Sequence, residues 1–103
     1  MKIKLKDAED MQRYFFGPNA DKQKIYTNIH QCIERGILND LDEVVFCNIE
    51  FLNDEEGFEM VCIKEDYSKN LDNVLNWYEE TNQFEKCKEI ITLKKLQNKK
   101  DGI

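Results

Sequence analysis

Two apolar, β-prone stretches separated by a short polar turn constrain the fold of this chain more than any other feature. The stretches cover residues 44–51 (VVFCNIEF) and 58–65 (FEMVCIKE), and the intervening LNDEEG favours a turn. Neighbouring stretches of this kind, joined by a short loop, predict a β-hairpin. On both sides of the hairpin the apolar residues recur at helical spacing. We therefore expect a small antiparallel sheet centred on one hairpin and packed with about four helices.

The hairpin has two alternative registers, which differ in their charge pairing. A loop over residues 53–56 would place Glu50 directly opposite Glu59, and like charges in that position destabilise a sheet. A loop over residues 55–57 avoids this clash and puts Gly57 where a positive φ is required. We expect the second register, in which the core face carries Val45, Cys47, Ile49, Phe51, Val61 and Ile63.

The other face of the expected hairpin carries Val44 and Phe46. Either a further helix covers this face, or it forms a binding or dimer surface. Because four helices are expected in a chain of 103 residues, we favour coverage by a helix.

The segment before the hairpin predicts one strand and two helices. Residues 2–6 alternate Lys with Ile and Leu, which is typical of a short edge strand. A helix capped by Asp7 follows and ends before Pro18. The next helix begins at Asn19 or Asp21, and Gly36 suits the left-handed position at its end.

The segment after the hairpin predicts two helices that form a helical hairpin, the first beginning at Ser68 or Asn70 and the second near Asn82. The element order is then β-α-α-β-β-α-α. This order indicates an α+β fold, in a single domain over residues 1–103.

Few residues are candidates for catalysis or metal binding. Cysteines occur at positions 32, 47, 62 and 87 without short paired spacing, and each lies among apolar residues, so we expect buried free thiols. The single histidine, His30, falls beside Glu34 and away from the apolar stripe of its helix, so we expect it to be exposed. The sequence contains no phosphate-binding loop, nucleophile elbow or calcium loop. We therefore expect no enzymatic activity, no catalytic residue, no cofactor and no metal.

Acidic residues are concentrated in the middle of the chain. The formal net charge is −6, yet residues 37–83 alone carry 13 acidic and 2 basic side chains, whereas both flanking segments are net positive. Nucleic-acid binders show clustered positive charge, so direct contact with nucleic acid is not expected. A negative surface on the hairpin would instead meet a basic partner and would mainly raise the association rate and the specificity.

We therefore expect a small acidic interaction protein without catalysis. It would bind a larger protein with a basic surface, such as a nucleic-acid-binding protein, and modulate or inhibit it. One alternative is a homo-oligomeric scaffold subunit, and another is a DNA or RNA mimic whose carboxylates are spaced like phosphates. The expected partner-binding residues are Glu50, Asp54, Glu55, Glu56, Glu59 and Phe46.

Composition adds expectations about origin and compartment. Lys outnumbers Arg, and Asn and Ile are abundant, a bias usual for AT-rich genomes such as those of many phages and mobile elements. An accessory factor of that origin fits the size and acidity. No apolar run is long enough to span a membrane, and residues 1–6 lack the apolar region of a secretory signal. Together with the expected free thiols, these features favour a cytoplasmic protein that has no membrane partner.

Overall fold

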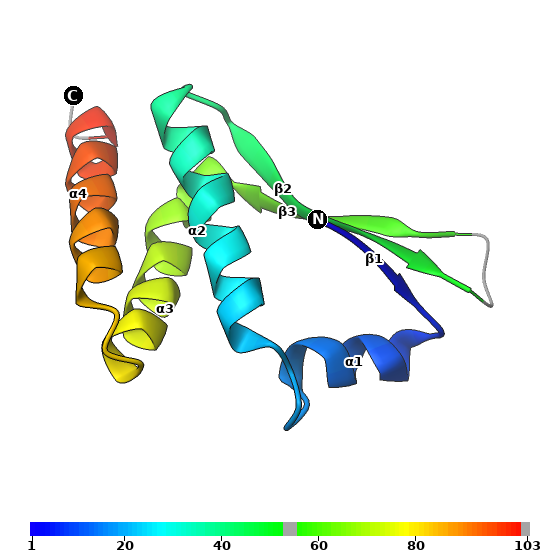
Figure 1. Cartoon of the computed structure of the whole chain (residues 1–103). Coiled ribbons are helices and arrows are strands. Elements are labelled where there is room, and N and C mark those ends of the chain that lie inside the picture. The colour runs from blue at the N-terminus through cyan, green and yellow to red at the C-terminus, as the bar shows by residue number, and fades with distance from the viewer. Residues whose placement is uncertain (53–55, 102–103) are drawn as a thin grey trace.

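A computed structural model of the chain describes residues 1–52 and 56–101 (Figure 1). The strands of its sheet are β1 (Lys2–Leu5), β2 (Glu43–Phe51) and β3 (Phe58–Ile63). The helices are α1 (Ala8–Phe16), α2 (Lys22–Leu38), α3 (Tyr67–Glu80) and α4 (Phe84–Asp101), and a 3-10 turn, η1 (Lys64–Asp66), leads into α3. The observed order, β-α-α-β-β-α-α, confirms the expected α+β fold. None of the described helices combines the length and apolar composition needed to cross a membrane.

The sheet is mixed, not wholly antiparallel. Its central strand, β2, pairs antiparallel with β3, as expected for the hairpin, and parallel with β1. Parallel pairing needs a long crossover connection, and α1 with α2 supplies it. The edge position of β1 was expected, but alternation of side chains along a strand does not reveal the direction in which that strand pairs.

The observed register of the hairpin is neither of the two considered from the sequence. Val45 lies opposite Val61, whereas Cys47 lies opposite Met60, so Phe46 is an extra residue that forms a β-bulge. A bulge shifts the alternation of the strand that contains it. Strict alternation therefore could not assign the faces of β2 correctly along its whole length.

The register of the hairpin and the bulge in β2 together explain why part of the expected core face is wrong. Cys47 and Ile49 are buried as expected, but Val61 and Ile63 are 43 % and 47 % exposed. Val44, expected on the opposite face, is buried beneath the helices and belongs to the core. The expectation that a helix covers Val44 is thus confirmed, and the open face of the sheet is the other one.

All the buried strand residues share one face of the sheet. Ile3 lies opposite Ile49, and Val44 opposite Cys62, and each of these residues is buried. Near Val44, the core is completed by residues of α2, α3 and α4, and around Ile49 it is completed by partly buried residues of α1. Figure 1 shows α1 beneath β1 and the hairpin extending beyond α2, α3 and α4.

The first two helices begin after capping residues, whereas α3 begins after Asp66 without a side-chain cap. The side chains of Asp7 and Asp21 accept hydrogen bonds from the backbone of the first turns of α1 and α2. Asp7 was the expected cap of α1, and Asp21 was one of the two starts expected for α2. The expected end of α2 at Gly36 is wrong, because the helix continues to Leu38. Gly36 is required for a different reason: a Cβ atom there would lie 2.6 Å from the Tyr67 hydroxyl oxygen.

The expected turn geometry at Gly57 is also wrong, because no described glycine has a positive φ. A Cβ atom at Gly57 would lie 2.2 Å from the carbonyl oxygen of Ile49. The glycine therefore allows the two strands of the hairpin to approach closely at this point.

Candidate interaction surface

The face of the sheet that lacks a helical cover is the candidate site, and we call it the outer face. The strand pairing assigns its residues, because directly paired residues in neighbouring strands point to the same side. All of them are exposed or half-buried. They are Lys2, Lys4, Glu43, Val45, Asn48, Glu50, Glu59, Val61 and Ile63.

Aliphatic side chains form the centre of the outer face. Val45 lies opposite Val61, and Ile63 follows two positions later on β3, opposite Glu43. Glu59 lies two positions before Val61, so carboxylates border the aliphatic centre at both ends. A partly exposed apolar centre with a charged rim is the usual anatomy of a surface that binds another protein.

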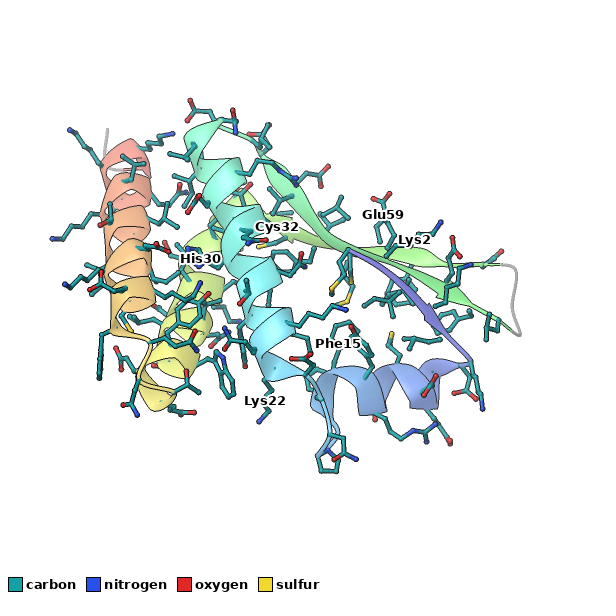
Figure 2. The ribbon with its side chains drawn as sticks, viewed as in Figure 1. Lys2, Phe15, Lys22, His30, Cys32 and Glu59 are labelled. Atoms are coloured by element: carbon teal, nitrogen blue, oxygen red, sulfur yellow. The ribbon has the colours of Figure 1, made fainter. Side chains whose placement is uncertain are left out.

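Lysines of β1 change the charge of this face from the one expected. The ammonium of Lys2 lies 3.1 Å from the Glu50 carboxylate, and Lys4 is the direct strand partner of Glu50. Figure 2 shows Lys2 and Glu59 on the side of the sheet away from Phe15 and α1. The sequence did not reveal these lysines as neighbours of the hairpin, because they are far away in the chain and the pairing of β1 is parallel.

The structure divides the expected partner-binding residues between two sides of the sheet. Glu50 and Glu59 share the outer face, and Glu56 is exposed just before β3. Phe46 lies on the inner side, packs against the helical core and accepts a hydrogen bond at its carbonyl from Asn28. Asp54 and Glu55 lie outside the described residues. Phe46 therefore does not join the acidic residues in one surface.

A cavity of about 430 Å³ occupies the inner side, between α1, α2 and the sheet. Phe15, Ile29 and Phe46 belong to its largely apolar wall, and Figure 2 shows Phe15 pointing from α1 toward the sheet. Lys22 has the only charged side chain among the described lining residues, and its ammonium lies 6.0 Å from the centre of the Trp77 ring. No carboxylate or imidazole is found among the described residues that line the cavity.

His30 is buried, with only 4 % of its surface exposed, so the expectation of an exposed histidine is wrong. Both α3 and α4 pack on α2, so two sides of α2 are covered. The Nδ1 atom of His30 lies 2.9 Å from the Tyr78 hydroxyl, and Nε2 lies 3.6 Å from a carboxylate oxygen of Glu34 and of Glu89. Nε2 has no hydrogen-bond partner among the residues that the structure describes.

The charge state of His30 follows from this burial. Burial lowers the pKa of His30, and the carboxylates of Glu34 and Glu89 oppose this effect, whereas the ammonium of Lys86 adds to it. The imidazole is therefore neutral near neutral pH.

The cysteines are buried and free, as expected. Burial raises the pKa of each thiol, and that of Cys62 reaches about 11. A thiol with a raised pKa supplies little of the thiolate that nucleophilic attack needs.

Groups of His, Cys, Asp and Glu suited to hold a metal ion are not found in the described part of the chain. Comparison with known proteins gives no match to a family model, to a curated protein or to a solved structure. The geometry of the outer face is therefore the basis for a functional argument.

Proposed function

We propose that this protein is a non-catalytic interaction module that binds a larger protein through the outer face of its sheet and thereby modulates or inhibits it. The observation that carries the proposal is the exposure of Val61 and Ile63 on the face of the sheet without a helical cover. Burying such apolar side chains against a partner removes them from water and favours binding.

Charge defines the kind of partner. Glu43 and Glu59 border the aliphatic centre, and both are exposed. A complementary surface would present an apolar patch flanked by Lys or Arg, which speeds the encounter and sets its orientation. Lys2 and Lys4 interrupt the acidic surface, so the geometry favours this mixed recognition over mimicry of a nucleic-acid backbone.

Affinity capture with matched variants tests the proposal. Immobilised wild type is compared with the double variant Val61→Ser and Ile63→Ser in an extract of the cells that make the protein. The control is Ile91→Ser, because Ile91 on α4 is exposed to a similar extent, 44 %. We expect specific partners to be recovered by the wild type and the control but lost from the double variant.

Charge reversal separates the electrostatic part of the proposal. The variant with Glu43→Lys and Glu59→Lys is compared with a control that reverses Glu79 and Glu80, which are exposed on α3. We expect weaker capture only for the first variant, with a difference that shrinks as salt is added.

Equal recovery by the wild type and the Val61/Ile63 double variant would overturn the proposed function.

A further inference from the structure

We infer that the free edge of β3 pairs with β3 of a second copy, joining the two sheets into one. This inference concerns the strand edge and does not depend on the proposed function of the outer face. The backbone geometry, the distribution of charge along the edges and the symmetry of β3 each contribute to the argument.

Unpaired backbone groups are present along β3. The strand order is β1-β2-β3, so β3 pairs only with β2 within the sheet. The amide of Lys64 donates to the carbonyl of Asp42 at 2.7 Å, which places the backbone groups of even-numbered β3 residues toward β2. Those of Glu59 and Val61 then point to the free edge. Between described residues, the backbone amides and carbonyls of Glu59 and Val61 form no backbone hydrogen bond outside the β2–β3 ladder.

The two edges of the sheet differ in their protection against further pairing. The β1 edge carries Lys2 and Lys4, whose charges discourage the addition of another strand. The β3 segment, FEMVCI, contains no Lys, Arg or Pro, and its outward side chains Val61 and Ile63 are exposed. The β3 edge is thus open to strand addition, whereas the β1 edge is protected.

Charge selects a self-complementary register. Antiparallel pairing centred on Val61 places each Glu59 opposite Ile63 of the other copy, so no like charges lie opposite one another. Centring on Cys62 would pair Glu59 with a position beyond β3 of the other copy, because Glu65 belongs to η1, and centring on Met60 would make the two Glu59 side chains diagonal neighbours. The register centred on Val61 also brings the Val45–Val61 pairs of both copies into one continuous aliphatic row on the outer face.

The expected association is reversible and dependent on concentration. A seam of one short strand from each copy is small compared with the roughly 1,600 Å² buried in a standard stable interface. We therefore expect the weight-average mass in sedimentation velocity to rise from that of one copy toward that of two as the concentration increases.

Val61→Pro tests the edge directly, because proline lacks the N–H that points to the free edge and leaves the bonds of Met60 and Cys62 to β2 in place. We expect this variant to remain monomeric at concentrations where the wild type dimerises. Ile91→Ser is the control, since it removes an exposed aliphatic side chain from α4, and it should dimerise like the wild type. Far-UV circular dichroism shows whether Val61→Pro keeps the wild-type fold.

Amide exchange of the wild type measured by NMR gives a second test that does not require the variant to fold. The Val61 amide should exchange more slowly at high than at low concentration, while the amide of Lys4 on the opposite edge should not change. A wild type that stays monomeric with unchanged Val61 exchange overturns the inference. Loss of dimers in Ile91→Ser but not in Val61→Pro also overturns it.

Discussion

His30 is a buried residue whose charge state is set by three helices at once. It lies on α2, its ring contacts Tyr78 on α3, and it faces Glu34 on its own helix and Glu89 and Lys86 on α4. Burial disfavours the imidazolium more than the two carboxylates favour it, so the pKa of His30 is lower than in the unfolded chain.

This lowered pKa predicts how stability depends on pH. As the pH falls, the unfolded chain takes up the proton first, near the ordinary pKa of 6.5. The stabilisation from neutral His30 is therefore fully present above that pH and is lost as the pH falls through the folded-state pKa. In urea unfolding, the stability advantage of the wild type over His30→Gln should shrink below pH 6.5.

The chain contains one histidine, so a single imidazole resonance reports its protonation in NMR. That resonance should titrate below pH 6.5 in the folded protein. A wild-type advantage that grows on acidification would show that Glu34 and Glu89 outweigh burial, contrary to this account.

At the scale of the elements, the sequence predicted the type and order of the strands and helices better than their pairing. Alternation in residues 2–6 and the two apolar stretches predicted three strands, Asp7 marked the start of α1 correctly, and Asp21 was one of the two starts expected for α2. The bulge at Phe46 could not be predicted, because it depends on how Val44 and Cys47 both reach the core. The parallel direction of β1 depends on contacts between residues far apart in the chain.

The parallel pairing of β1 can be tested with an engineered disulfide. Lys2 and Asn48 are direct strand partners, and adjacent strands bring paired residues within the range that a disulfide needs. We expect the double variant Lys2→Cys and Asn48→Cys to form this bond on mild oxidation, because the native thiols are buried. The measurement is mass spectrometry of the non-reduced digest.

A control pair, Lys6→Cys with Asn48→Cys, keeps one cysteine in place and moves the other beyond the end of β1. This pair should form the bond much more slowly. Equal cross-linking of the two pairs would argue against the observed register.

At the scale of the whole molecule, the shape explains why one face of the sheet is open. The radius of gyration is 14.8 Å and the principal extents are 46 × 31 × 15 Å. A compact domain of this length would have a radius of about 13 Å. The chain thus forms a broad, thin body in which the helices cover only one face of the sheet.

The sequence could predict only part of the candidate site on this open face. The acidic character of the hairpin was evident, and Glu50 and Glu59 do share a face. The exposure of Val61 and Ile63 was missed, because aliphatic residues in a strand normally indicate burial. Only the register and the position of the helices show that these residues face outward.

Cysteine accessibility tests the central claim that the outer face contacts a partner. Native thiols are buried with raised pKa values, so maleimide reports selectively on a cysteine introduced at an exposed position. The matched positions are Val61 and Ile91, which are 43 % and 44 % exposed. Labelling rates of Val61→Cys and Ile91→Cys are compared, at one low concentration, between buffer and extract of the producing cells.

The labelling rate of a free thiol peptide is measured in buffer and in extract. Both protein rates are divided by it, which corrects for the different reactivity of maleimide in the extract. We expect a partner that covers the outer face to slow labelling at position 61 in the extract and to leave labelling at position 91 unchanged. Unchanged labelling at both positions would contradict the claim that the outer face contacts a partner.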